Sequence, residues 1–236
     1  MSVDQDLHVA VMVNRIILVG GGKGGVGKST VAMAVLDTLR AAGLNTVYVE
    51  TDNSNPDVYK AVSGQMTSEI CNLDAEAGYI RLGDIIEAHR ESCIVVNTAA
   101  RATDALIEHS GILTDVSKEL GRDLIMLWPI NRQRDSLELL RKFLDHAQSQ
   151  SYAAVFAVLN TYFGAADKFT RYLSSKIKDR VTGTVVFPEL NDMVSDKLTD
   201  NRLAIWNADE QLTIAARSVL RRFRDAAHAA LQPVYG

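Results

Sequence analysis

Short runs of apolar residues, rich in valine and isoleucine, recur along the chain and alternate with stretches in which apolar residues follow a helical period. Such near-continuous apolar runs are typical of strands buried on both faces of a parallel sheet. The runs interpreted as strands are 15–19, 46–50, 93–96, 123–128, 153–159 and 184–187. Their alternation with helical stretches predicts βαβ units with right-handed crossovers. The expected fold class is therefore α/β, a doubly wound, mostly parallel sheet flanked by helices.

Helical spacing predicts helices between these runs, over 30–42, 136–147 and 168–178. An amphipathic helix is also predicted at the end of the chain, over 212–232. The prolines all fall at the ends of predicted elements, where they disturb regular structure least. They are Pro56, Pro129, Pro188 and Pro233.

No linker, repeat or low-complexity tract divides the sequence, so we expect a single domain over 1–236. Residues 1–14 are expected to form a flexible leader or an edge segment. The composition, with 47% hydrophobic and 23% charged residues, argues against a disordered or fibrous protein. A formal net charge of -4 gives no global attraction to nucleic acid or anionic lipid, although a local basic patch can still act.

The two cysteines, Cys71 and Cys93, are too far apart in the sequence to form a Cys-x-x-Cys motif. This argues against a disulfide framework or a cysteine-rich metal site. No stretch approaches the ~20 uncharged apolar residues that a membrane-spanning helix needs. The segment before the first strand carries Asp4 and Asp6 and does not resemble a signal peptide. We therefore expect a cytoplasmic protein.

A glycine-rich segment lies between the first predicted strand and the first predicted helix and fits the pattern Gly-x4-Gly-Lys-[Ser/Thr]. In that context the pattern is typical of a P-loop, whose backbone N–H groups face phosphates at a helix N-terminus. Lys28 is expected to reach the β- and γ-phosphates and Ser29 to place its hydroxyl on Mg²⁺. The expected ligand is ATP. The predicted cradle consists of Gly22, Lys23, Gly24, Gly25, Val26, Gly27, Lys28, Ser29 and Thr30.

The loop carries a second lysine, Lys23, in the arrangement Lys-Gly-Gly-x-Gly-Lys-Ser. This arrangement resembles the deviant Walker A motif of the ParA/MinD family of P-loop ATPases. The resemblance implies a protein that forms a homodimer with ATP, in which the extra lysine of each subunit touches the phosphates of its partner. By position, Lys23 is that lysine here.

The segment after the second predicted strand resembles switch I of that family, usually written Asp-x-Asp. Asp52 matches the second aspartate, and the resemblance implies that it positions the attacking water; Lys23, Lys28 and Asp52 are thus the expected catalytic residues. Glu50 stands in place of the first aspartate, and its longer carboxylate can still hold a Mg²⁺-bound water. A simpler alternative is an acidic turn that caps the following helix through Asp52 or Asp57.

The third predicted strand resembles the Walker B strand, with Asn97 in the place of the Mg²⁺-associated aspartate. An asparagine keeps an acceptor oxygen but loses the negative charge, which weakens the hold on Mg²⁺. The residues expected at the metal are Ser29, Glu50 and Asn97. Because hydrolysis depends on finer positioning than binding does, slow or partner-dependent turnover is the resulting hypothesis.

Two later segments resemble the adenine-side segments of the family. They contain Asn160 and the pair Pro188 and Glu189. An asparagine amide can pair with the adenine edge, and backbone groups near Pro188 and Glu189 can complete base recognition. Asn160 is also common as a turn residue at a strand end, which is an alternative to a binding role.

The C-terminal helix places Arg217, Arg221, Arg224 and His228 on one stripe beside an apolar face. One interpretation is a helix packed on the core with a solvated row of arginines. Another, implied by the resemblance, is nonspecific DNA binding through Arg217, Arg221 and Arg224. A membrane helix is disfavoured, since the apolar face is mostly alanine and the helix contains Asp225.

The resemblance implies an ATP-dependent dimerising switch with a small activator or adaptor partner. Small plasmid-encoded members of the family, of the TraL or StbB type, are similar in size and loop, which suggests plasmid or chromosome partition, plasmid stability or conjugative transfer. Three alternatives stay open: a nucleotide-dependent recruitment module that does not hydrolyse ATP, a membrane-associated positioning ATPase like MinD, and a metabolic enzyme. The last needs pocket loops for which this chain has little room.

Overall fold

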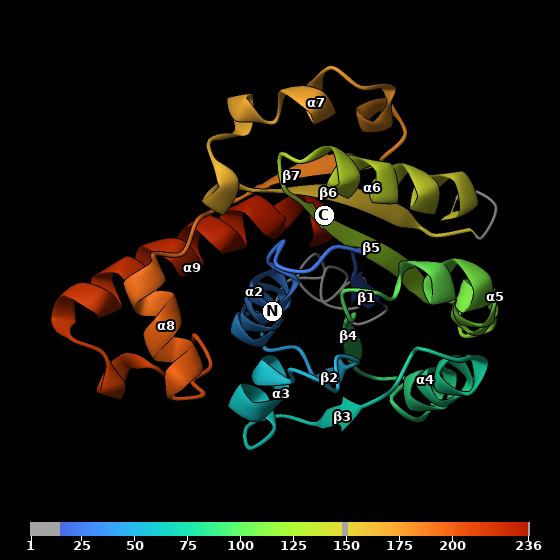
Figure 1. Cartoon of the computed structure of the whole chain (residues 1–236). Helices are drawn as coiled ribbons and strands as arrows, with labels where there is room; N and C mark the ends of the chain where they lie inside the picture. The colour runs from blue at the N-terminus through green and yellow to red at the C-terminus, as the bar shows by residue number, and fades with distance from the viewer. Residues whose placement is uncertain (1–14, 148–150, 236) are drawn as a thin grey trace, which may run out of the picture.

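The computed structural model describes residues 15–147 and 151–235, so the predicted leader over 1–14 lies outside the described residues. Within these ranges, one seven-stranded sheet has the order β3-β2-β4-β1-β5-β6-β7, and every pair of neighbours is parallel (Figure 1). The strands are β1 (Arg15–Val19), β2 (Thr46–Glu50), β3 (Ser68–Ile70), β4 (Cys93–Asn97), β5 (Asp123–Ile130), β6 (Ala154–Asn160) and β7 (Gly183–Phe187). The predicted fold class is confirmed.

Helices cover both faces of the sheet, as a parallel sheet requires. The helices are α2 (Lys28–Ala41), α3 (Asp57–Val62), α4 (Glu76–Ala88), α5 (Thr103–Glu119), α6 (Arg134–Ala147), α7 (Thr170–Leu173), α8 (Asp192–Asp200) and α9 (Ile214–Tyr235), with short 3-10 turns η1 (Thr161–Phe163), η2 (Ala166–Lys168), η3 (Lys176–Asp179) and η4 (Asp209–Gln211). One core packs α2, α3, α8 and α9 against the sheet, and the other packs α4, α5, α6 and α7 against its opposite face (Figure 1).

Each strand contributes side chains to both cores in alternation. In β1, Ile17 and Val19 belong to the first core, while Ile16 and Leu18 belong to the second, because successive side chains of a strand point to opposite faces. This explains the continuous apolar runs of the sequence. Strand β1 lies between β4 and β5, where the winding of the chain reverses, and ligands of such sheets bind beyond the carboxyl ends of the strands at that point.

Three details of the secondary structure differ from the sequence prediction. The segment predicted as one helix over 168–178 is instead broken into η2, α7 and η3; the Ser174 hydroxyl donates back to Thr170 O, and Ser175 caps η3 by accepting from Ile177 N, so local side-chain bonds end the helix. Strand β3 was not predicted, since it is three residues long and none of them is buried.

The third difference concerns two prolines predicted at element ends. Pro129 lies inside β5. Its partner is Val158 on β6, whereas pairing with β1 has already ended at Leu127. Beyond that point β5 is bonded on one side only, and a missing N–H is tolerated there. Pro233 lies in the last turn of α9, near its end but still within the helix.

Helix α9 is held against α2 by a buried ion pair. Asp37 on α2 is fully buried, and Arg224 reaches it with two hydrogen bonds, from Nε at 2.7 Å and from Nη2 at 2.8 Å. His228 Nε2 lies 2.8 Å from the same carboxylate. This corrects the predicted stripe: Arg224 and His228 face α2, while Arg221 is exposed and Arg217 is half-buried. Arg224 is therefore engaged within the fold through Nε and Nη2.

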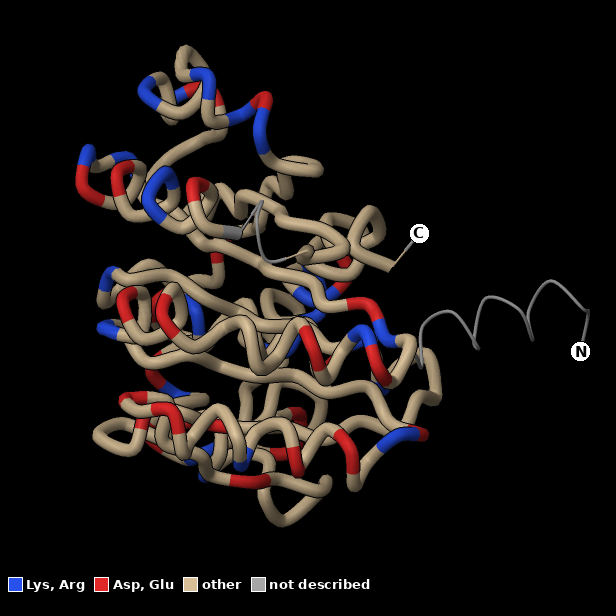
Figure 2. Tube along the Cα trace, turned by 90° about the vertical axis from the view of Figure 1, so that its right-hand side faces the viewer, with Lys and Arg blue, Asp and Glu red and all other residues tan. Residues whose placement is uncertain are grey.

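Charges of both signs are interspersed along the chain trace (Figure 2), as expected for a chain with a small net charge. No helix in the described part of the chain is both long and apolar enough to cross a bilayer.

We predict that Arg224→Ala lowers the free energy of unfolding by about 3 kcal/mol, because it leaves the buried Asp37 carboxylate without its bidentate partner. Urea denaturation measures this. The matched control is Arg221→Ala, on the same helix but exposed, for which a change within about 0.5 kcal/mol is expected. Equal losses in the free energy of unfolding for the two variants would contradict a stabilising role for the Arg224–Asp37 ion pair.

Candidate functional site

The glycine-rich segment connects β1 to α2 at the carboxyl edge of the sheet. Gly27 caps α2 in a left-handed conformation with φ 94°, and the cap makes no side-chain hydrogen bond. A Cβ at Gly22 would collide with Thr103 Oγ1 on α5, and one at Gly27 would collide with the amide of Asn160. The glycines are thus required for close packing. The first N–H groups of α2 lack a side-chain cap, and such groups favour an anion.

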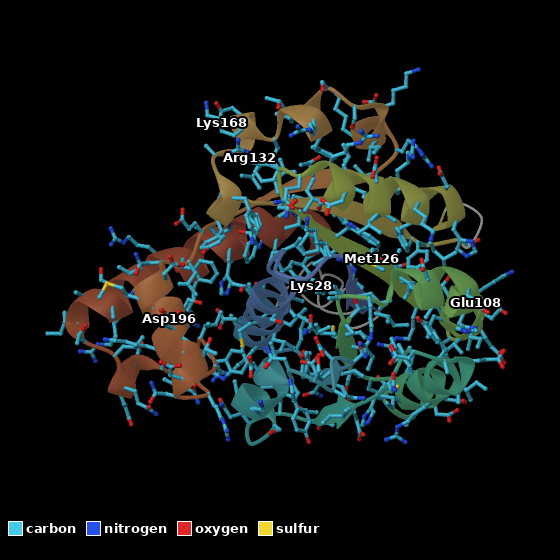
Figure 3. The ribbon with its side chains drawn as sticks, viewed as in Figure 1. Lys28, Glu108, Met126, Arg132, Lys168 and Asp196 are labelled. Carbon is cyan, nitrogen blue, oxygen red and sulfur yellow. The ribbon has the colours of Figure 1, made fainter. Side chains whose placement is uncertain are left out.

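Lys28 is the first residue of α2 and appears near the middle of the view in Figure 3. Its side chain is folded back along the loop, and Nζ donates to Lys23 O at 3.0 Å. Burial lowers the pKa of Lys28 to about 8, although the nearby carboxylates of Asp52 and Glu50 act in the opposite direction. A buried cation with a lowered pKa gains from any phosphate that replaces its lost hydration.

A cavity of about 480 Å³ opens in front of this loop, within the size range of small-molecule sites. Its lining brings together residues that the sequence analysis selected from five separate segments. These are Gly24, Gly25, Gly27, Lys28, Ser29, Thr30, Asp52, Asn97, Asn160 and Pro188. The carboxyl ends of β1, β2, β4 and β6 and the segment after β7 thus meet at one cavity.

Lys23 is held within its own chain. Nζ donates to Asp135 Oδ2 at 2.5 Å and also to Gln133 Oε1. Asp135 lies at the start of α6, and its contact with Lys23 lowers the pKa of its carboxyl. Because Asp135 is exposed, the ion pair is screened by solvent and contributes little to stability. Lys23 can therefore exchange this partner for a phosphate without disturbing the core.

Glu50 and Asn97 are direct partners in the β2–β4 register. Asn97 Nδ2 donates to the Glu50 carboxylate, at 3.2 Å to Oε1 and 3.4 Å to Oε2. Glu50 also accepts from the Tyr48 hydroxyl at 2.5 Å and from the backbone N–H groups of Thr51 and Asp52. Glu50 is fully buried, and burial raises the pKa of its carboxyl. Asn97, rather than Glu50, lines the cavity.

The residues at this point fit a nucleotide-bound Mg²⁺. Mg²⁺ keeps several waters and binds through substrate phosphates and few protein groups, and the described residues contain no group of three or more His, Cys, Asp or Glu side chains that could hold a metal ion by itself. Ser29 Oγ is 3.4 Å from Asn97 Nδ2. Asn97 Oδ1 is buried and has no hydrogen-bond partner in the described part of the chain. The Asn97 amide nitrogen donates to Ser29 Oγ, and the Ser29 hydroxyl, which lines the cavity, keeps a further lone pair for Mg²⁺.

The Asp52 carboxylate lies at the cavity but is used locally. Oδ1 accepts from Ser54 Oγ at 2.5 Å, from Ser54 N at 3.1 Å and from Asn55 N at 3.3 Å. The bonds from Ser54 lower the pKa of Asp52, so its carboxylate is ionised near neutral pH. These bonds form an acidic turn, which the sequence analysis gave as the alternative to a switch I aspartate. The cap of α3 is Pro56, without a side-chain bond, so Asp52 orders the loop and not the helix.

Asn160 lies at the end of β6 with both ends of its amide engaged. Nδ2 donates to Val26 O at 3.0 Å, and Oδ1 accepts from Tyr162 N at 3.1 Å. Asn160 therefore ties the P-loop to β6, and one N–H of its amide is left for a ligand. Pro188 lines the cavity, whereas Glu189 is exposed, outside the lining.

The structure adds cavity residues that the sequence analysis missed. They are Asn55, Thr98, Ala100, Tyr162, Phe163, Leu190, Asp192, Ser195 and Asp196. Tyr162 and Phe163 directly follow Asn160, and aromatic residues after a strand end were a usable signal for a base-stacking surface. Asp196 is on α8 (Figure 3), a helix that no sequence motif marked, so its place at the cavity depends on how the chain returns after β7.

Comparison with known proteins agrees with this geometry. The family model described as CobQ/CobB/MinD/ParA nucleotide binding domain matches residues 17–200. The chain belongs to this family. Protein MobD of Acidithiobacillus ferrooxidans is 40% identical over 227 residues, which cover 94% of this chain and 99% of MobD. Protein TraL of Escherichia coli is 24% identical over 233 residues, which cover 89% of this chain and 94% of TraL.

Among solved structures, a putative plasmid partition protein from Borrelia burgdorferi bound to AMPPNP superposes with a TM-score of 0.59. It is 15% identical, and the match covers 93% of this chain and 99% of that one. At such identity the likeness shows the fold alone. The predicted membership of the ParA/MinD family is confirmed, and the chain carries a nucleotide-binding domain of the CobQ/CobB/MinD/ParA family.

We predict that nucleotide binding takes up protons near pH 8. Lys28 has a pKa of about 8 in the free site, and a bound phosphate favours its charged form, so about half a proton is taken up at pH 8 and affinity falls as the pH rises further. Calorimetric titration with ADP in two buffers of different ionisation enthalpy measures the uptake. The control is Lys28→Arg, which stays protonated in this range. The absence of proton uptake by the wild type at pH 8 would contradict the lowered pKa.

Proposed function

We propose that the chain is an ATP-dependent dimerising switch with slow or partner-stimulated ATP hydrolysis. The observation that carries this proposal is Lys23, a second lysine in the P-loop whose contacts in its own chain are exposed. A partner phosphate is a stronger ligand for an ammonium than an exposed carboxylate, because charge-assisted bonds strengthen as water is excluded. ATP binding would thus draw Lys23 across a subunit interface.

The roles within the site follow from the contacts. Lys28 and the N–H groups at the start of α2 bind phosphate, Ser29 with Asn97 holds Mg²⁺, and Asp52 positions the attacking water after release from its local turn. Mg²⁺ would supply charge neutralisation between the phosphates. Among the described residues, the carboxylates that line the cavity are Asp52 and, on α8, Asp192 and Asp196; the strand end of β4 offers the uncharged Asn97 in place of an aspartate, so hydrolysis without a partner is proposed to be slow.

The setting we propose is plasmid or chromosome partition, plasmid stability or conjugative transfer. Similarity over nearly full length to MobD and TraL and the fold shared with a putative plasmid partition protein support it. A small activator or adaptor protein is the proposed partner. The second candidate function is a recruitment module that binds nucleotide without cleaving it, and the loss of charge at Asn97 favours it.

We predict that ATP or a nonhydrolysable analogue converts the wild type to a dimer, that ADP does not, and that Lys23→Ala stays monomeric with every nucleotide. Light scattering coupled to size exclusion measures mass, and phosphate release is followed on the same samples. Lys168→Ala is the control, since Lys168 is also exposed and pairs with the adjacent Asp167.

Dimers with turnover support the switch, and dimers without turnover, even with cell extract added, support the recruitment module. A monomer under all conditions would rule out both versions of the Lys23 argument.

We propose that α9 binds DNA through Arg217 and Arg221 only, since Arg224 pairs with Asp37. We predict that Arg217→Ala combined with Arg221→Ala weakens retardation of duplex DNA by the ATP-bound protein and lowers the slope of log affinity against log salt by about 0.9 for each phosphate that is no longer neutralised. The control is Arg90→Ala, an exposed arginine paired with Glu87. An unchanged salt slope would exclude α9 as the DNA surface.

A further inference from the structure

A second cavity, of about 470 Å³, lies beside the nucleotide cavity. We call it the basic hollow, because arginines dominate its lining, which consists of Asn131, Arg132, Gln133, Arg134, Phe163 and Arg171. Phe163 lines both cavities, so the two are adjacent. In the view of Figure 3, Arg132 lies above Lys28 and Asp196 lies to its left. The basic hollow and α8 are thus on different sides of Lys28 in this view.

Two arginines of the basic hollow have no acidic partner among the described residues. Arg134 pairs with Glu138. Arg132 Nη1 donates to Phe163 O and Arg171 Nη1 donates to Arg132 O, each at 3.2 Å. A guanidinium has five N–H donors, so most donors of both side chains stay available. The carbonyl contacts place two unpaired cations at one hollow, which favours an anion there.

The rim of the nucleotide cavity on α8 carries the opposite charge. Asp192 and Asp196 are one helical turn apart, both are exposed, and both line the cavity. Neither carboxylate has a hydrogen bond or an ion pair with the rest of the described chain. Like charges at this spacing destabilise a helix, and a polyanion in the cavity adds to the repulsion. A cation supplied from outside the chain would relieve both effects.

Two-fold symmetry would bring these two surfaces together. In the proposed dimer, Lys23 reaches the phosphates of a second copy, so the residues beside Lys23 must face the cavity of that copy. Gln133 accepts from Lys23 Nζ and also lines the basic hollow. The hollow of each copy would therefore face the cavity rim of the other, and every such contact occurs twice in a two-fold dimer.

Carboxylates near the basic hollow make duplex DNA a poorer occupant. Glu138 pairs with Arg134, and the exposed Asp135 follows Arg134 in the chain. A continuous run of phosphates would meet these carboxylates as well as the arginines, and like charges in contact oppose binding. A short helix face with two carboxylates suits the two unpaired arginines better.

We propose that the basic hollow of one copy receives the acidic face of α8 from a second copy, so that Arg132 and Arg171 pair with Asp192 and Asp196 across the interface. This inference rests on the proposed function, because it concerns the nucleotide-dependent dimer. It adds a contact at the periphery to that of Lys23 at the phosphates. Complementary charges fix the register of two surfaces and reject partners that lack them.

An exchange of charges tests this pairing. Arg132→Glu with Arg171→Glu gives a variant with carboxylates on both surfaces, and Asp192→Lys with Asp196→Lys gives one with cations on both. With a saturating nonhydrolysable ATP analogue and Mg²⁺, each variant alone should have a dimer dissociation constant at least about tenfold above that of the wild type, because like charges then face each other twice.

An equal mixture of the two double variants should form heterodimers about as tightly as the wild type dimerises. In the heterodimer both contacts join opposite charges, one in the original direction and one reversed. Sedimentation gives the dissociation constants, and native mass spectrometry separates heterodimers from homodimers by mass. Recovery in the mixture also shows that both variants are folded.

Arg90→Glu with Lys118→Glu is the matched control, since it changes the net charge as much as the first double variant does. Both residues are exposed. They lie near the ends of α4 and α5 that lead into β4 and β5, at the edge of the sheet opposite the cavity. The dimer dissociation constant of this control should equal that of the wild type.

A mixture without heterodimers, when the wild type dimerises, would overturn the inference and leave the proposed function intact. The inference is equally wrong if Arg132→Glu with Arg171→Glu dimerises as tightly as the wild type, even where this variant no longer retards duplex DNA; the hollow would then be a DNA site. A wild type that stays monomeric with the analogue would contradict the proposed function, and this inference with it.

Discussion

The parallel register of β1, β2 and β4 is the constraint on which the site depends. Val19 on β1 and Glu50 on β2 both align with Asn97 on β4, so the three strands end at the same level. The P-loop leaves β1 there, and the acidic loop leaves β2 there. A shift of one residue in β2 would turn Glu50 to the opposite face of the sheet and break its contact with Asn97 on β4. The chemistry of the cavity is thus set by strand alignment.

Charge balance in the cavity follows from that alignment. Lys28 is the cation among the residues that line the cavity, and burial lowers its pKa, whereas the carboxylates of Asp52 and Glu50 act to raise it. One of those carboxylates is at the cavity and the other is behind Asn97. Phosphate entering on the open side would be met by a lysine and a helix N-terminus. The acidic groups are held away from it by their own hydrogen bonds.

Local patterns were sufficient to predict much of this arrangement. The apolar runs predicted six of the seven strands, and the spacing of glycines and lysines predicted the loop. The contacts that decide how the site works join distant parts of the chain and leave no local pattern. Lys23 meets Asp135 112 residues later, and the Asn97 amide meets Glu50 from a different strand. Such contacts depend on sheet order, which periodicity alone does not give. The same limit applies at the C-terminal helix, where the partner of Arg224 is Asp37, 187 residues earlier. A fully buried carboxylate must be paired or hydrogen-bonded, and at Asp37 the partners are Arg224 and His228, so Asp37 determines the face of α9 that packs.

The strengths of these contacts divide the molecule into fixed and exchangeable parts. Helix α2 begins with Lys28, the proposed phosphate ligand, and further along carries the buried Asp37 that anchors α9. A buried bidentate pair resists rearrangement, so the start of α2 is a fixed support. Lys23 and Asp52, in contrast, are held by partners at the surface, where hydrogen bonds to water can replace them at little cost. The groups that the proposed function requires to change partners are therefore the ones that the fold holds least tightly.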